Sequence, residues 1–409
     1  MQENIVILGT GFIAGYLNRG LHYLFSELRQ PMAGNVCAIG KHPEKLASRT
    51  NILKDCVLCT DPIDSVLFKF HPTILIVAVP PTVSVDIAKT ILLPYYNTLR
   101  AASQPLPDLY SFTPTPDENW YANLLGNDVS IVKILPNIFT DVHGIDITSV
   151  GINTISPTPA FKHSSRRALL DILLTPYGKT VSLSASQALI FLAGKITSHV
   201  CCEACFCIHE AAQKAGLSVT LNDIGKAFQY AQRSFTKFFD DPIPSLRRND
   251  ALPPTMQEFM HHFSDSWFGG LHDFTTSMPV CVSDEEALSL DVYSYALNTI
   301  AIAVKTKEEL EQDTKNAATK GGILERGVEY FYEVIESELG NQAFSASCDH
   351  QISSGYWETL RSQVCNLSRE AYERSLPASY ITLTMPFSLL CFCCLRFRCL
   401  WLPSRINHP

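Results

Sequence analysis

"NIVILGTGFIAGYL" (residues 4–17) decides the fold of this chain. Four apolar residues, Ile5–Leu8, predict a buried strand, and a helix-like pattern begins soon after them. Between the two lie Gly9, Gly11 and Ala14, in the pattern G-x-G-x-x-A. The first glycine permits a tight turn, the second lets the backbone approach a pyrophosphate, and the small third residue lets helix and strand pack closely. We therefore predict a dinucleotide site here; a purely structural corner is the alternative.

The predicted pyrophosphate contacts are the residues of this turn, Gly9, Gly11, Phe12, Ile13 and Ala14. The helix that follows would face the phosphates with its N-terminus, where free backbone N–H groups and the helix dipole favour anions.

The residues after the second apolar run, Val36–Ile39, indicate which cofactor fits. NAD sites usually place Asp or Glu after this strand, where it binds the ribose hydroxyls. This chain has Lys41 and His42 instead, in "IGKHPEKLASR" (39–49). Cations suit the additional phosphate of NADP. We predict NADP rather than NAD, with Lys41 and His42 as contacts; a solvated basic helix start is the alternative.

Strand-like and helix-like segments alternate through the first half of the chain. The runs "TILIVAV" (73–79) and "VSIVKIL" (129–135) are continuous and apolar, as in strands buried on both faces. Such alternation predicts an α/β domain with a Rossmann-type parallel sheet over residues 1–183. The Pro- and Ser-rich stretch 101–120 is predicted to be a surface insertion.

From residue 184 to 376 most segments have helical spacing, which predicts an all-α domain with an insertion at about 240–280. The remaining tail, 377–409, is apolar and rich in cysteine but contains Arg396 and Arg398. It makes a marginal membrane span. We expect it to lie outside the fold, as an erroneous or alternatively translated end. A membrane contact is the alternative, which its two arginines make less favourable.

Composition excludes several classes of protein. The chain has 409 residues, a net charge of −8 and no dominant basic region, which argues against nucleic acid as a partner. It starts directly with a strand and shows no signal peptide, so its 14 cysteines indicate reduced thiols and a cytoplasmic location.

Three further motifs, with the glycine turn, follow an order known from one family. They are "IVAVPP" (76–81), "KILPNIFTDVHG" (133–144) and "ATKGGILERG" (318–327). Together they resemble the pyrroline-5-carboxylate reductases over about residues 3–340. The resemblance implies a Rossmann domain followed by a helical dimerisation domain, a homodimer or larger homo-oligomer, and NAD(P)H. It also implies hydride transfer to the C=N carbon of a small cyclic imino acid, as in proline biosynthesis.

The resemblance also implies roles for single residues. Val79 and Pro81 would line the cofactor ribose, and Asn137 would lie beside the nicotinamide. Thr319 and Lys320 would take part at the reacting end. The implied substrate-binding residues, which hold the carboxylate, are Gly321 and Gly322. No metal is expected.

The substrate half departs from the family pattern. Two threonines that follow the Gly-Gly pair in the family are Ile323 and Leu324 here, and the preceding proline is Lys320, a cation that could attract a carboxylate. Two alternatives therefore stand beside a reductase. One is a catalytically inactive, NADP-binding dimeric homologue that works as a sensor or interaction protein. The other is a hydroxyacid-dehydrogenase-like reductase that uses Lys195.

Two cysteine pairs and a group of histidines have spacings that raise the question of a metal site. Cys56/Cys59 and Cys202/Cys205 have C-x-x-C spacing, and three histidines lie between 261 and 272. A zinc site needs four well-placed ligands. We expect buried small side chains and aromatic packing instead.

Overall fold

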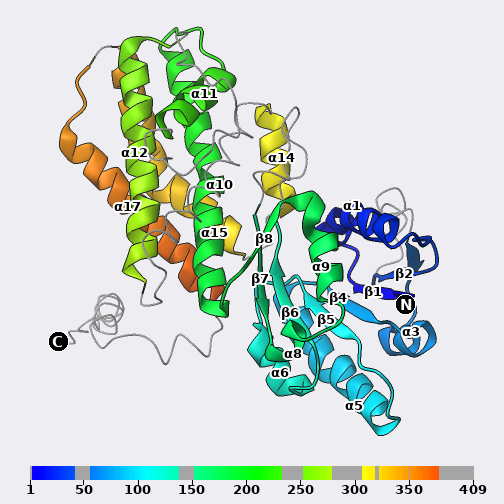
Figure 1. Ribbon diagram of the computed structural model, residues 1–409. Coiled ribbons are helices and arrows are strands. Elements are labelled where there is room, and N and C mark those ends of the chain that lie inside the picture. Colours follow the sequence, from blue (N-terminus) through cyan, green and yellow to red (C-terminus); the bar gives the residue numbers. More distant parts are fainter. Residues whose placement is uncertain are drawn as a thin grey trace, which may run out of the picture.

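A computed structural model describes residues 2–41, 56–137, 152–232, 252–278, 306–317, 322–348 and 350–376. Its eight strands form one sheet in the order β3-β2-β1-β4-β5-β6-β7-β8 (Figure 1). The strands are β1 (Ile5–Leu8), β2 (Val36–Ile39), β3 (Val57–Cys59), β4 (Ile74–Val77), β5 (Asp108–Ser111), β6 (Ile131–Leu135), β7 (Ile152–Pro157) and β8 (Lys179–Ser182). Neighbouring strands are parallel except for β6 and β7. The first six follow the order of the Rossmann dinucleotide-binding fold, which confirms the predicted α/β class.

Helices cover both faces of the sheet, so its central strands are apolar throughout. On one face a core cluster joins the strands to α1 (Phe12–Glu27), α8 (Pro159–Lys162) and α9 (Arg167–Leu174). On the other face lie α3 (Ile63–Phe70), α4 (Pro81–Ile87), α5 (Leu93–Ala101) and α6 (Glu118–Leu125). A π-helical turn, Ala88–Leu92, joins α4 to α5.

The interpretation of 101–120 as a surface insertion is wrong. Residues 108–111 of this stretch are β5, which is buried and pairs with β4 on one side and β6 on the other. Its first residue, Asp108, is acidic and only 3% exposed. A buried carboxylate needs compensating partners, and these come from distant residues that sequence periodicity does not connect with the strand.

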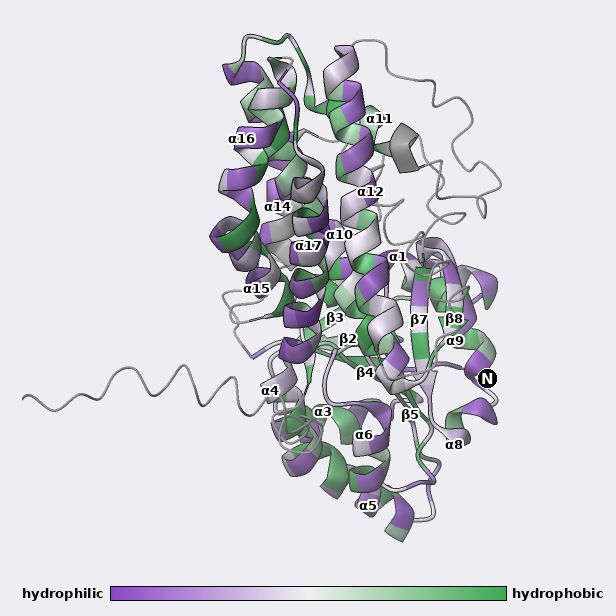
Figure 2. Cartoon of the chain, turned by 90° about the vertical axis from the view of Figure 1, so that its left-hand side faces the viewer, coloured by the Kyte–Doolittle hydropathy of each residue, from purple (hydrophilic) through white to green (hydrophobic). Residues whose placement is uncertain are grey.

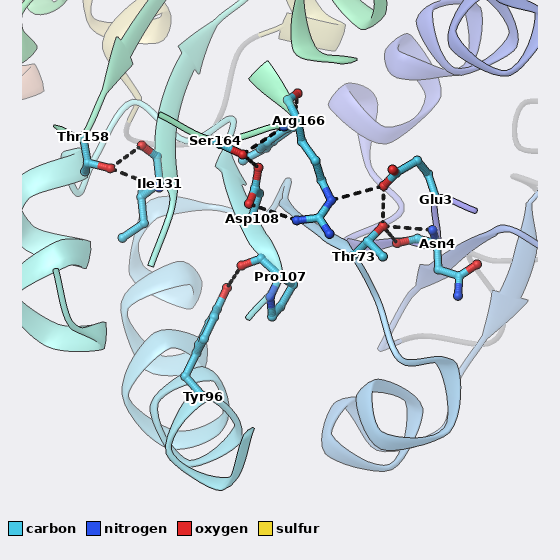
Figure 3. A network of polar contacts seen from close by, with 11 residues as sticks. Glu3, Asn4, Thr73, Tyr96, Pro107, Asp108, Ile131, Thr158, Ser164 and Arg166 are labelled. Atoms are coloured by element: carbon cyan, nitrogen blue, oxygen red, sulfur yellow. Dashed lines mark hydrogen bonds and ion pairs between the residues drawn. The ribbon is translucent and has the colours of Figure 1, made fainter. Parts of the chain in front are cut away.

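The partners of Asp108 form a polar network at the amino end of the sheet (Figure 3). Ser164 donates to Oδ2 of Asp108 at 2.7 Å, and Nη1 of Arg166 lies 3.4 Å from Oδ1. The Nε of Arg166 lies 3.4 Å from Oε2 of Glu3, which also accepts a hydrogen bond from Thr73. One arginine thus links Glu3, two residues before β1, to the first residue of β5.

The second half of the chain is a helical bundle around the long helix α10 (Ala185–Lys214). Its other described helices are α11 (Leu221–Gln232), α12 (Pro254–Ser277), α14 (Lys307–Ala317), α15 (Ile323–Tyr330), α16 (Glu336–Ser347) and α17 (Ser354–Ser375). Surface helices such as α16 carry hydrophilic and hydrophobic stripes (Figure 2). Among the described residues, α10 alone is long and apolar enough to span a membrane, and 83% of its most apolar window is buried. That burial is typical of a core helix.

Within the predicted insertion at 240–280, residues 254–277 form a regular helix of the bundle, and the insertion itself stays a prediction. These residues form α12, whose Phe259, Phe263 and Trp267 belong to the bundle core. Helices α12 and α17 approach so closely at Gly270 that a Cβ there would lie 2.3 Å from the Arg361 carbonyl oxygen. The aromatic side chains therefore fill the bundle itself. The tail 377–409 lies outside the described residues.

Candidate functional site

The carboxyl ends of the parallel strands meet at one edge of the sheet. Leu8 is aligned with Ile39 on one side and with Val77 on the other, and Val77 is aligned with Ser111. Strand order reverses between β1 and β4, because the chain goes outward to β2 and β3 and then returns. Ligands of open α/β sheets bind at such a switch point, beyond the carboxyl ends. The structure therefore brings the predicted glycine turn, Lys41 and the 78–81 segment to the same edge.

Gly9 occupies a position that only glycine fits. Its φ is +118°, and a Cβ there would lie 2.4 Å from the Ala78 carbonyl oxygen and 3.1 Å from Cγ1 of Val79. Its N–H donates to the Ile39 carbonyl oxygen at 2.9 Å, which continues the ladder between β1 and β2. The first glycine thus lets the turn pass directly against the loop that follows β4.

Gly11 differs from Gly9, because a Cβ at this position would meet no described atom within 4 Å. Gly11 is exposed and is the N-cap of α1, and no side chain caps this helix end. The first turn of α1 contains no acidic residue. Phe12 is 37% exposed, whereas Ala14 is fully buried. An open backbone at an uncapped 16-residue helix has the properties that a pyrophosphate group requires.

Of the two residues predicted to select the cofactor, Lys41 lies within the described residues and His42 does not. Gly40 donates its N–H to the Cys59 carbonyl oxygen, and Lys41 follows as an exposed residue beside the end of β2. No carboxylate occupies residues 40 and 41. His42 lies outside the described residues, so its predicted role stays a prediction.

The loop after β4 supplies the two predicted ribose contacts. Val79 packs partly into the core and Pro81 begins α4, which no side chain caps. Ser84, in the first turn of α4, donates its hydroxyl to the Pro81 carbonyl oxygen at 2.6 Å. This bond fixes the start of α4 beside the glycine turn.

Asn137, predicted to lie beside the nicotinamide, is fully buried. Its backbone N–H donates to Oδ1 of Asn153 at 2.9 Å, and its side-chain amide donates to the Tyr177 carbonyl oxygen at 3.2 Å. Asn153 in turn donates to the carbonyl oxygens of Leu174 and Gly178. Asn137 therefore fixes the end of β6 against β7 through its backbone N–H and against the Leu174–Gly178 segment through its side chain. Its catalytic role stays a prediction, and sequence reasoning missed Asn153 because nothing marks it before the strands are paired.

Lys195 reaches the same end of β6 from the helical bundle. Its ammonium donates to the carbonyl oxygens of Pro136 and Ile152, both at 3.1 Å, and lies 5.0 Å from the ring centroid of Phe191. Part of the side chain is accessible, but the ammonium end is enclosed, and burial lowers the pKa of Lys195 to about 7. An amine of this pKa can give or take a proton near neutral pH. The sequence suggested Lys195 only under the hydroxyacid-dehydrogenase alternative.

The predicted substrate loop ends at the start of α15, at about the level of Lys195 along α10. Gly322 is the N-cap of α15, and no side chain caps it. A Cβ at Gly327 would contact Ile196 and Val200, whereas one at Gly340 would contact Cys207, so α15 and α16 run in the same direction as α10. Gly322 then lies within about one helical turn of Lys195 along the helix axis. Thr319, Lys320 and Gly321 lie outside the described residues.

Cysteine and histidine provide no metal centre within the described ranges, where no group of three or more suitable ligands occurs. Cys202 and Cys205 are buried, and His262 stacks on Trp357 with ring centroids 5.4 Å apart.

Comparisons with known proteins concern the fold. No protein-family model matches the sequence, and no curated protein sequence matches it. A pyrroline-5-carboxylate reductase from Coxiella burnetii is 13% identical, with 88% of this chain and 99% of that chain covered and a TM-score of 0.34. One from Plasmodium falciparum, solved with NADP bound, is 13% identical over 88% and 100%, with a TM-score of 0.34. A glycerol-3-phosphate dehydrogenase from Saccharomyces cerevisiae is 12% identical over 89% and 99%, with a TM-score of 0.39. TM-scores and identities of this size carry no argument about substrate or site.

Proposed function

We propose that this chain is an NADP-dependent oxidoreductase that reduces the C=N bond of a small cyclic imino acid, as the resemblance to pyrroline-5-carboxylate reductases implies. The observation that carries the cofactor part is the glycine turn at the strand switch. Gly9 is forced to be glycine by the fold, whereas Gly11 leaves an open backbone at an uncapped helix end. A purely structural corner explains why residue 9 is glycine, but it does not explain why residue 11 is glycine.

The residues of this edge fit the cofactor in the order in which it would lie. Gly11 and the first turn of α1 would hold the pyrophosphate, and Lys41 the additional phosphate of NADP. Val79 and Pro81 would line the ribose. When bound, the cofactor supplies the hydride. The chain's own residues orient the two reactants and fix the end of β6 through Asn137.

The substrate end is formed by the helical half. The uncapped start of α15 at Gly322 offers backbone N–H groups to a carboxylate, and Gly321 and Lys320 directly precede it. Thr319 would complete the loop. Because hydride addition to C=N also requires a proton at nitrogen, an enclosed amine such as Lys195 at this position is chemically suitable.

The first test is NADPH oxidation by the purified full-length chain with pyrroline-5-carboxylate, with NADH in parallel. Imine-dependent oxidation with a preference for NADPH supports the proposal. The matched control is Gly11→Asp, which places a side chain and a negative charge at the pyrophosphate position. Unchanged NADPH affinity in this variant would contradict the nucleotide site. Binding without turnover would favour the inactive sensor or interaction protein.

Lys195 supports a second candidate, a reductase that converts the C=O of a small oxoacid to the hydroxyl of the hydroxyacid. The lysine lies at the carbonyl of Pro136, the residue before Asn137, which the resemblance puts beside the nicotinamide. Turnover of an oxoacid that Lys195→Met abolishes, while NADPH affinity is kept, would favour this candidate over imine reduction. If the variant keeps its turnover, the candidate is wrong.

We also propose a cytoplasmic homodimer joined through the helical half. Tyr332, Val334 and Phe344 are 55%, 38% and 46% exposed on the continuous helix 323–347, which supports an interaction surface there. Light scattering of the full-length chain measures the oligomer, and Phe344→Glu should shift it toward monomer. An unchanged mass would exclude Phe344 from the interface.

A further inference from the structure

A row of polar side chains crosses the sheet beneath the predicted nicotinamide end. Ser111 on β5 is aligned with Lys133 on β6, and Lys133 is aligned with Ser156 on β7. Residues aligned in this way point to the same face of a sheet, with Cβ atoms about 5 Å apart. Val132, Ile134 and Ile155 fill the core of the α1 side, so the polar row faces α4 and α6. All three side chains of the row are at most 1% exposed.

Helix α6 places two more polar groups over this row. Glu118, the first residue of α6, is 5% exposed, and Tyr121 follows one turn later and is fully buried. Burial raises the pKa of Tyr121, and the nearby hydroxyls of Ser84, Ser111 and Thr113 oppose this effect. The Lys133 ammonium lies close enough to Glu118 for each to shift the pKa of the other. Because α6 starts at the carboxyl edge of the sheet, the ammonium points toward that edge.

Several atoms of this cluster have no hydrogen-bond partner in the part of the chain that the structure describes. They are Nζ of Lys133, Oε2 of Glu118, Oγ of Ser156 and Oγ1 of Thr154. An isolated orphan atom is unusual in a folded protein, and four on one sheet face and its covering helix are more so. A buried charge without a partner is among the most destabilising features that a protein interior can contain.

We propose that this cluster is an internal hydration site, in which ordered water bridges the Lys133 ammonium to the Glu118 carboxyl and to the hydroxyls of Tyr121 and Ser156. Buried waters typically make about three hydrogen bonds to buried polar groups that otherwise lack partners. The cluster provides both donors and acceptors, which a bridging water needs and which a bound anion would not tolerate because of Glu118. Burial lowers the pKa of Lys133 to about 8, so near neutral pH the bridge joins an ammonium to a carboxyl.

The hydration site shares its walls with the predicted cofactor edge. Ser84 joins it to Pro81 through a 2.6 Å hydrogen bond, and Thr113, whose Oγ1 lies 2.9 Å from Oγ of Ser111, follows the end of β5. The water-bridged pair Lys133 and Glu118 therefore packs beneath the loops that follow β4 and β5, on the side toward the sheet, and stabilises them. This role does not depend on the proposed reaction.

A crystal structure of the full-length chain at about 1.5 Å resolution tests the proposal directly. The expected result is ordered water within hydrogen-bond distance of Nζ of Lys133 and Oε2 of Glu118. A direct contact between these two atoms, or a cluster without ordered water, would overturn it.

Thermal unfolding of a double-mutant cycle gives the second test. Lys133→Met alone and Glu118→Leu alone should each lower Tm by several degrees, because each leaves the other group and its water unbalanced. The double variant should recover most of this loss. The control Lys89→Met removes an exposed lysine and should leave Tm unchanged. Purely additive losses, or a Tm raised by Lys133→Met alone, would contradict a bridged pair.

Discussion

Nζ of Lys195 lies 3.1 Å from the carbonyl oxygen of Pro136, so a residue of the helical bundle is hydrogen-bonded to the end of a sheet strand 59 positions earlier in the chain. The contact places an enclosed amine at the end of β6, directly before Asn137. It also couples the protonation of this amine to the way in which the two halves of the molecule pack.

The first prediction concerns pH and stability. Burial lowers the pKa of Lys195 from 10.5 to about 7, so the unfolded chain binds more protons than the folded chain between these values. The free energy of unfolding should therefore rise with pH through this window. Lys195→Met should flatten the rise, as measured by urea unfolding at pH 7 and pH 9.5, whereas Lys89→Met should not. An equal slope in wild type and Lys195→Met would show that the amine titrates normally.

The two glycines of the turn should respond in opposite ways. Gly9→Ala introduces a Cβ 2.4 Å from a backbone oxygen at a positive φ, and we expect a loss of about 2 kcal/mol or more in unfolding free energy. Gly11→Asp should leave Tm within about a degree of wild type and abolish NADPH binding. Calorimetry and fluorescence titration separate the two effects. Equal destabilisation by both variants would make the turn a structural corner only.

Cofactor choice should depend on Lys41. Replacing it by glutamate puts a carboxylate where the additional phosphate of NADP would bind, so Lys41→Glu should weaken NADPH binding by about tenfold or more and NADH binding far less. The measurement is the ratio of the two dissociation constants at fixed salt. A parallel change in both would assign Lys41 a general electrostatic role.

The network in Figure 3 predicts a large stability effect away from the site. Arg166→Met leaves Asp108 and Glu3 buried without their cation, and we expect a loss of about 3 kcal/mol at pH 7. Burial already raises the pKa of Asp108, so this carboxyl should protonate on acidification and the loss should shrink toward pH 4. The control Arg326→Met breaks exposed pairs and should cost less than about 1 kcal/mol. A pH-independent loss would point to packing of the arginine stem.

The helical half offers a matched glycine pair. Gly270→Ala should destabilise by about 2 kcal/mol, because its Cβ would collide with the α17 backbone. Gly355→Ala, in the first turn of α17 with open space around it, should stabilise by about 0.5 kcal/mol. Urea unfolding measures both. Tolerance of Gly270→Ala would mean that α12 and α17 can move apart freely.

The sequence predicted well those features that depend on neighbouring residues. The strand, turn and helix at residues 5–27 follow from apolar periodicity and glycine chemistry alone, and β4 and β6 follow from β-branched runs. Strand β5 was missed because "DLYS" begins and ends with polar residues. The partners of its buried Asp108, Ser164 and Arg166, are supplied 56 and 58 positions later. Helix α12 was missed because histidines and glycines lie between the aromatic residues that fill the core, so its apolar spacing is hard to recognise in the sequence. The buried bonds of Asn137 and Lys195 depend on strand pairing, which no local pattern encodes.

The reversal of chain direction between β6 and β7 has a consequence for α10. Since β8 runs parallel to β7, Leu183 leaves the sheet beside Ile155. Helix α10 then runs back along the sheet before Lys195 meets the carbonyl of Ile152, the first residue of β7. The ten steps along the helix from Ala185 to Lys195 rise about 15 Å. The length of β7 and β8 along the strand direction thus determines which residue of α10 lies beside the end of β6. One inserted residue before Lys195 would turn its side chain by about 100°, whereas seven would restore its direction and lift it about 10.5 Å above Pro136. The contact between Lys195 and Pro136 therefore requires this length of helix before Lys195 as much as it requires a lysine at that position.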